Sequence, residues 1–183
     1  MTARKILLAT FGVLVFATAA SEARPRPGGN LGGRSFDANK TFGLGLELGA
    51  PTGLVGKYFL SPDRALDFGI GDLYTYFNRS GLHIYGDYLF HPVSFVSAPA
   101  FELPLYVGVG ARFWDFGYRD VNQDRSAFAF GVRVPVGVSF DFNNVPLDIF
   151  VQVVPVIDFF SGYAPHTVFF DVDGSVGVRY WFN

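Results

Sequence analysis

From Thr41 to the C-terminus the chain repeats one pattern, in which apolar residues occupy every second position of short segments. The clearest segment covers residues 128–140. Its alternate positions are Phe128, Phe130, Val132, Val134, Val136, Val138 and Phe140, and the positions between them are Ala129, Gly131, Arg133, Pro135, Gly137 and Ser139. Successive side chains of a β-strand point to opposite faces, so such a segment has one apolar face and one polar or small face. The period of two predicts strands rather than helices.

Eight segments carry this alternation. They cover residues 41–49, 54–60, 65–76, 82–90, 103–114, 128–140, 147–159 and 168–182. An even number of strands suits a closed antiparallel barrel, which leaves no strand edge unpaired. We therefore predict an all-β chain, an eight-stranded antiparallel up-and-down transmembrane β-barrel over residues 41–183. Pro135 and Pro155 lie inside strands and lack a backbone N–H, so bulges or local gaps are expected there.

The composition helps to assign the two faces. Charged residues make up 16% of the chain and hydrophobic residues 50%, whereas soluble domains have about 25% charged residues. The charges and most strand glycines share the face opposite the apolar one. On the apolar face, aromatic residues gather at segment ends and aliphatic residues fill the middles, as in the lipid-facing band of a transmembrane barrel. The alternative is a soluble barrel or sandwich with the apolar face inside.

The predicted inner face carries charges of both signs. They are Glu47, Lys57, Asp67, Asp87, Arg112, Arg133, Asp148, Asp158, Asp171, Asp173 and Arg179. Because an eight-stranded lumen is narrow, we interpret them as a charge network that fills it with ion pairs. A polar path for ions is the alternative. His83, Asp87 and His91 share this face, but residues four apart on a strand lie about 13 Å apart, too far to share a metal.

The N-terminus has the order of a secretory signal peptide. Arg4 and Lys5 precede an uncharged apolar run over residues 6–17, and small residues follow it up to Ala23. The run is shorter than the roughly 20 residues of a membrane-spanning helix. We predict a signal peptide over residues 1–23 and a flexible Pro/Gly-rich lead without regular structure over residues 24–40.

The C-terminal residues 177–182 resemble the terminal signal of bacterial outer-membrane barrels, with Gly177, Tyr180 and Phe182 at the characteristic positions. The departure is Asn183, since that signal usually ends on the aromatic residue. Residues 41–182 resemble small eight-stranded outer-membrane proteins of the OmpA, OmpX and OmpW type. Residues 43–71 are more similar to uncharacterised small outer-membrane barrels.

This resemblance implies porin-like architecture in the outer membrane of a Gram-negative cell envelope, with both termini in the periplasm. Outer-membrane lipid, periplasmic chaperones and the barrel assembly machinery are the partners it implies.

For function, the sequence favours a non-catalytic barrel with a structural or surface-interaction role, whose outward loops make any contacts. The longest polar loop is expected over residues 115–125. Its candidate contact residues, for an unknown surface ligand, are Tyr118, Arg119, Asp120, Asn122 and Asp124. The alternatives are a narrow ion channel and a lipid-acting barrel enzyme with His166, Thr167 and Ser161 near its site.

No cofactor, metal or nucleic-acid partner is expected. The chain has no Cys and a net charge of -2. Residues 120–124 resemble the start of a calcium loop, but Arg125 stands where that loop requires Gly.

Overall fold

The computed structural model describes residues 30–72, 81–120, 123–161 and 168–182. The signal peptide predicted over residues 1–23 lies outside the described residues. The described chain forms ten strands. They are β1 (Asn30–Arg34), β2 (Phe42–Gly49), β3 (Thr52–Ser61), β4 (Arg64–Asp72), β5 (Leu82–Ser97), β6 (Phe101–Asp120), β7 (Gln123–Arg133), β8 (Val136–Phe142), β9 (Leu147–Ser161) and β10 (Val168–Phe182). None of the described residues belongs to a helix long and apolar enough to cross a membrane.

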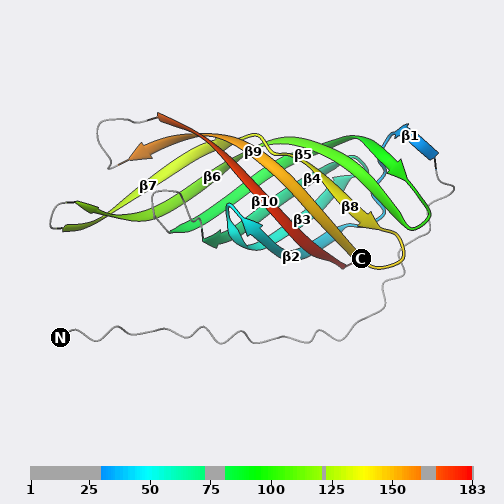
Figure 1. Ribbon diagram of the computed structural model, residues 1–183, viewed down its shortest axis with the longest axis horizontal. Coiled ribbons are helices and arrows are strands. Elements are labelled where there is room, and N and C mark those ends of the chain that lie inside the picture. The colour runs from blue at the N-terminus through cyan, green and yellow to red at the C-terminus, as the bar shows by residue number, and fades with distance from the viewer. Residues whose placement is uncertain (1–29, 73–80, 121–122, 162–167, 183) are drawn as a thin grey trace, which may run out of the picture.

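The strands close into a ring of antiparallel neighbours (Figure 1). From β2 to β6 each strand pairs with the next one along the chain, and β10 pairs with both β9 and β2. β7 and β8 occupy one position in the ring, because each pairs with β6 on one side and β9 on the other. The described strands thus occupy eight positions, and the predicted up-and-down β-barrel is confirmed.

The pair that closes the barrel joins the first and last full strands. β2 and β10 align from Phe42 opposite Phe182 to Gly49 opposite Ser175. We call the end where β2 begins and β10 ends the terminal end, and the opposite end the distal end. The C-terminus and β1 lie toward the same end in Figure 1. Since every strand of the ring has two neighbours, most of its backbone N–H and C=O groups are paired within the barrel.

Two prolines account for the interruption between β7 and β8. The N–H of Gly108 donates to the Pro135 carbonyl at 2.9 Å, and the N–H of Val134 donates to the Pro155 carbonyl at 3.0 Å. Neither proline has an N–H with which to return a hydrogen bond to its partner. The local gap expected at Pro135 is therefore present, whereas β9 runs through Pro155 without a break.

Three segments differ from the sequence prediction. The loop expected over residues 115–125 is largely strand, because β6 and β7 remain paired up to Asp120 opposite Gln123. The connection expected over residues 91–102 is also shorter, since β5 continues to Ser97 and β6 begins at Phe101. Polar residues can also pair across strands, so both strands extend beyond the segments in which apolar residues alternate.

The third difference concerns the N-terminal lead, for which no regular element was expected. β1 lies within it and pairs with the last residues of β5, from Asn30 opposite Ser97 to Arg34 opposite Ser94. Beyond Phe90, β5 has no pairing with β4, and this free edge is where the Gly-rich segment pairs. Phe36 and Lys40, which follow β1, are both buried.

Candidate functional site

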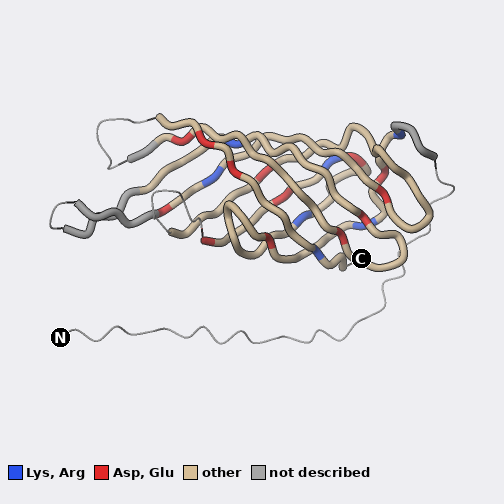
Figure 2. The backbone as a smooth tube through the Cα atoms, viewed as in Figure 1, with Lys and Arg blue, Asp and Glu red and all other residues tan. Residues whose placement is uncertain are grey.

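The barrel has an apolar outside and a charged inside. Side chains of β5 alternate regularly between exposed and buried from Leu82 to His91, and β4 and β8 show the same alternation over most of their length. Exposed aliphatic residues include Leu46, Ile84, Val109, Val132, Val151, Val153 and Val176. Exposed aromatic residues include Phe140 and Phe182 toward the terminal end and Phe113, Phe128, Phe130 and Phe159 toward the distal end. Figure 2 shows charged residues of both signs distributed along the strands.

Ten of the eleven residues of the predicted charge network are buried. The exception is Asp171, whose side chain is 36% exposed. The buried ten come from β2, β3, β4, β5, β6, β7, β9 and β10, so every position of the ring contributes to the lumen. A buried charge without a partner is very unfavourable. The structure arranges eight of the ten into three groups along the barrel, and Glu47 and Lys57 have other partners.

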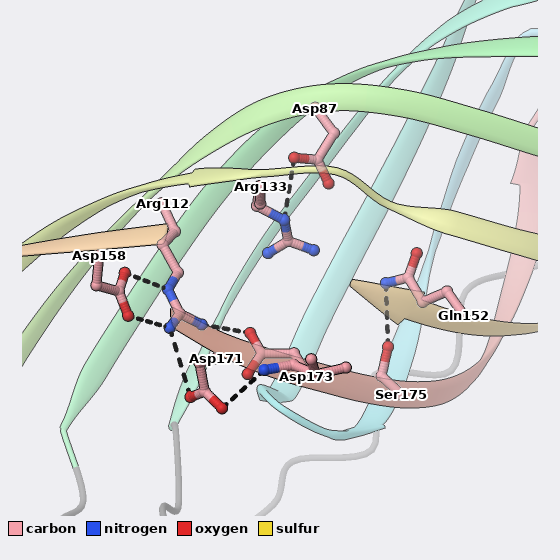
Figure 3. Close-up of polar contacts among 9 residues, drawn as sticks. Asp87, Arg112, Arg133, Gln152, Asp158, Asp171, Asp173 and Ser175 are labelled. Atoms are coloured by element: carbon pink, nitrogen blue, oxygen red, sulfur yellow. Dashed lines mark hydrogen bonds and ion pairs between the residues drawn. The ribbon is translucent and has the colours of Figure 1, made fainter. Parts of the chain in front are cut away.

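The distal group is centred on Arg112 of β6 (Figure 3). Its Nε donates to Asp158 Oδ1 at 2.9 Å, and its Nη2 donates to the second oxygen of the same carboxylate. Its Nη1 donates to Asp173, and Asp171 Oδ2 lies 3.8 Å from Nη2. The planar guanidinium suits this forked arrangement. The Arg112 guanidinium thus links β6 with two strands from another part of the ring, β9 and β10.

The central group contains Arg133 of β7. Its Nε lies 3.1 Å from Asp87 Oδ1, and its guanidinium lies 3.8 Å from the centre of the Tyr85 ring. Within the described residues, Nη1 and Nη2 of Arg133 have no hydrogen-bond partner. The oxygens of Asp87 and the hydroxyl of Tyr85 also lack a hydrogen-bond partner there. Polar atoms around Arg133 are therefore less completely paired than those around Arg112.

A chain of hydrogen bonds crosses the centre of the barrel. Tyr106 Oη donates to Gln152 Oε1 at 3.2 Å, and Gln152 Nε2 donates to Ser175 Oγ at 3.0 Å. Ser175 Oγ donates in turn to Glu47 Oε2 at 3.2 Å. This chain connects β6, β9, β10 and β2, and it gives the buried Glu47 carboxylate a neutral donor.

The group nearest the terminal end is centred on Arg179 of β10. Its Nε and Nη2 donate to the two oxygens of Asp148 at 3.1 and 2.9 Å, and its Nη1 donates to Asp67 Oδ1 at 2.9 Å. The guanidinium also lies 4.2 Å from the centre of the Phe150 ring. Two carboxylates from different parts of the ring therefore share one cation, and all three side chains are buried.

Lys57 has a different environment. Its Nζ lies 2.8 Å from His91 Nε2, and it stands 5.1 Å from the ring centre of Phe59 and 4.8 Å from that of Tyr106. His91 Nδ1 lies 3.2 Å from the Asp63 carbonyl oxygen, which fixes the ring orientation. Aromatic faces favour a cation at these distances.

Inward-facing glycines make room for these groups. A Cβ on Gly131 would lie 2.2 Å from Asp158 Oδ1, and one on Gly69 would lie 2.3 Å from the Tyr85 ring. A Cβ on Gly177 would lie 2.4 Å from the Phe150 ring. Large and small residues therefore alternate across the lumen and fill it, as expected of an eight-stranded barrel.

Sequence reasoning identified the residues of the network but not their partners. It missed several buried polar residues, among them Lys40, Gln152, Ser175 and Asp141. Gln152, Ser175 and Asp141 lie in phase with the charged inner face, and this phase was the signal that could have identified them. Lys40 lies in the lead, where no alternation exists.

The other predicted residues are placed as follows. Gly177, Tyr180 and Phe182 lie in β10, and Phe182 aligns with Phe42. Tyr118, Arg119, Asp120 and Asp124 lie in the hairpin of β6 and β7, and Asn122 lies outside the described residues. Ser161 ends β9, whereas His166 and Thr167 lie outside the described residues. Within the described part of the chain, no group of three or more His, Cys, Asp or Glu residues could hold a metal ion.

Comparison with known proteins gives a family and a fold. A family model described as a protein of unknown function (DUF3996) matches residues 34–180. No curated protein matches the chain. Among solved structures, the chain is similar to the N-terminal β-barrel domain of OprF from Pseudomonas aeruginosa. The TM-score is 0.54 at 15% sequence identity, over 77% of this chain and 95% of that one. This likeness supports the barrel architecture.

Proposed function

The chain belongs to the DUF3996 family of proteins of unknown function, and from its geometry we propose that it is an outer-membrane β-barrel with a structural or surface-interaction role. In this proposal the barrel is a membrane anchor and performs no catalysis. The segments at its distal end make whatever contacts the protein has with a surface ligand.

The observation that carries this proposal is that the polarity of a soluble protein is reversed, with apolar side chains outside and charged side chains inside. Exposed apolar side chains surround the barrel, while Arg112, Arg133 and Arg179 are buried. A continuous apolar surface of this kind would aggregate in water. In a bilayer, aliphatic residues would contact the hydrocarbon and the aromatic residues near each end would lie at the two interfaces.

The proposed orientation places the terminal end in the periplasm and the distal end outside the cell. It rests on the C-terminal residues Gly177, Tyr180 and Phe182, which resemble the terminal signal of outer-membrane barrels. Export by the predicted signal peptide, delivery by periplasmic chaperones and insertion by the barrel assembly machinery belong to the same proposal. Outer-membrane lipid is then the main partner of the apolar surface.

The filled lumen weighs against the ion-channel alternative. Arg112 and Arg179 each bind two carboxylates inside the lumen, and large side chains occupy the space left by inward-facing glycines. An ion would have to displace these pairs in order to pass. The alternative of a lipid-acting enzyme depends on His166 and Thr167, which lie outside the described residues.

The test is to refold residues 24–183 into detergent micelles and to run unboiled and boiled samples on SDS gels. We expect a mobility shift and a far-UV circular dichroism spectrum of β-structure. Reconstitution into a planar bilayer should then give no stepwise current. Solubility without detergent, together with no mobility shift, would contradict the membrane-barrel proposal. Regular single-channel steps would instead support the channel.

A further inference from the structure

The segment before β2 lies across the terminal mouth of the barrel. β1 pairs with the C-terminal residues of β5, at the terminal end of the barrel. The chain then passes to β2, where Phe42 pairs with both β3 and β10. Between these points, Phe36 and Lys40 are only 4% exposed. We call residues 34–40 the strap. The burial of Phe36 and Lys40 shows that the strap packs these two side chains onto the barrel interior, while Arg34, Ser35 and Asp37 stay exposed.

Phe36 adds a ring to an aromatic layer that spans the lumen near its terminal end. Its ring centre lies 5.2 Å from that of His91 and 5.8 Å from that of Phe59. Phe59 stacks on Trp181 at 5.5 Å, and His91 lies 5.8 Å from Tyr106. The layer thus contains side chains from β3, β5, β6 and β10, and Phe36 is its member from outside the ring of strands.

Lys40 supplies an ionic contact to the opposite wall. Its Nζ forms a buried ion pair with Asp141 of β8 and donates to the Phe142 carbonyl at 2.7 Å. It also lies 5.9 Å from the centre of the Trp181 ring. A buried ion pair with an additional hydrogen bond fixes the position of a side chain strongly. Phe36 and Lys40 therefore hold the strap at two separate places in the mouth.

The barrel does not need the strap to complete its backbone pairing. The ring closes through β2 and β10. The Ala38 N–H donates to the Pro62 carbonyl at 2.8 Å, and the side chains of Phe36 and Lys40 make the contacts described above. The strand pairs that close the ring do not include residues 35–40. A segment outside these pairs can open locally at a lower free energy than the strands, so the strap can detach while the barrel remains folded.

We propose that the strap is a removable stopper, which closes the terminal mouth of the lumen and keeps solutes from the Lys57–His91 pair behind it. When the strap is released, the part of the lumen between the terminal end and the Arg179 group becomes open to small polar molecules. The inference depends on the fold alone and does not rest on the proposed membrane function.

The experiment uses a cysteine reporter, because the chain has no cysteine of its own. Ser139 is the next inward-facing residue of β8 beyond Asp141 and is 3% exposed, so Ser139→Cys places a thiol behind the strap. The probe is a small, charged methanethiosulfonate reagent, added to the full chain in detergent micelles. Asn144→Cys, on the exposed turn after β8, reports on reagent activity.

Two variants loosen the strap. The first combines Phe36→Ala with Lys40→Ala, and the second is Asp141→Asn, which keeps the shape of the partner but removes its charge. The matched control combines Phe95→Ala with Arg64→Ala, since both side chains are exposed and lie outside the strap. Each is made in the Ser139→Cys background, and heat-modifiability on SDS gels is measured for every variant.

We expect the introduced thiol at position 139 to react slowly in the otherwise unchanged chain and in the matched control. In both strap variants its rate should rise roughly tenfold or more, because the open fraction grows as contacts of the closed state are lost. The unboiled mobility should be unchanged. Equal rates in all variants would overturn the proposal, as would fast reaction of this thiol in the otherwise unchanged chain. Loss of the compact band in both strap variants would also overturn it, because the strap would then be an integral part of the barrel.

Discussion

Arg179 and Asp148 lie directly opposite each other on β10 and β9, and they are joined by two hydrogen bonds inside the barrel. The same guanidinium reaches Asp67 on β4, which is not a neighbour of either strand. This three-residue group therefore fixes the register of one strand pair and also links two sides of the lumen. Substitution of Arg179 tests how much this group contributes to the free energy of unfolding.

Arg179→Met should strongly destabilise the barrel. The substitution keeps much of the apolar stem but leaves Asp148 and Asp67 buried without the guanidinium that both contact, and breaking a buried ion pair in this way costs about 3–5 kcal/mol. The free energy of unfolding can be measured by urea titration in lipid vesicles. The matched control is Arg64→Met, because Arg64 pairs with Asp63 at the surface and exposed ion pairs contribute about 0–1 kcal/mol. Equal effects of the two substitutions would contradict the role assigned to Arg179.

Gly131→Ala should destabilise the barrel through overpacking. The new Cβ would lie 2.2 Å from Asp158 Oδ1 and 3.0 Å from Arg112 Cγ, so the bidentate pair would have to move. Overpacking of this kind costs about 1–3 kcal/mol. Gly86→Ala is the control, because no atom lies within 4 Å of its added Cβ. The same urea titration should show little change in the free energy of unfolding for Gly86→Ala. A larger decrease for Gly86→Ala than for Gly131→Ala would refute the packing argument.

The architecture could be predicted from the sequence because alternation is a local property. Arg112 and Arg133 could be assigned to the inner face from their phase alone. Their partners could not, since Asp158 is 46 residues from Arg112 along the chain and a register is needed to bring them together. Side-chain direction was thus predictable, whereas cross-barrel pairing was not.

The N-terminal lead shows where local reasoning failed. Phe36 and Lys40 have no alternating neighbours, and the surrounding Pro and Gly residues indicated an irregular chain. Their order comes from tertiary contacts, namely the rings of Phe59 and His91 and the carboxylate of Asp141. The same applies to residues 115–120 and 123–125, where pairing between β6 and β7 overrides polar composition.

Pro135→Ala should repair part of the interruption between β7 and β8. Residue 135 would gain an N–H that can donate to Gly108, whose own N–H already donates to the residue 135 carbonyl at 2.9 Å. Because the added hydrogen bond and the lost rigidity of proline each change stability by about 1 kcal/mol, the net change should be small. Hydrogen exchange followed by NMR is the better readout. The new amide should exchange as slowly as its strand neighbours, and fast exchange would show that another factor holds the gap open.

Val153 and Gln152 allow a direct test of which face contacts lipid, because they are adjacent in β9 and point in opposite directions. Val153 is 52% exposed between the two aromatic zones, whereas Gln152 is buried and hydrogen-bonded to Ser175. Val153→Arg should reduce the free energy of unfolding in vesicles by about 2–4 kcal/mol, the cost of a cation near the middle of a bilayer. Asn144→Arg, on an exposed turn, should change it little. If Val153→Arg instead has no effect in vesicles, the apolar surface does not lie in lipid and the proposed membrane anchor is wrong.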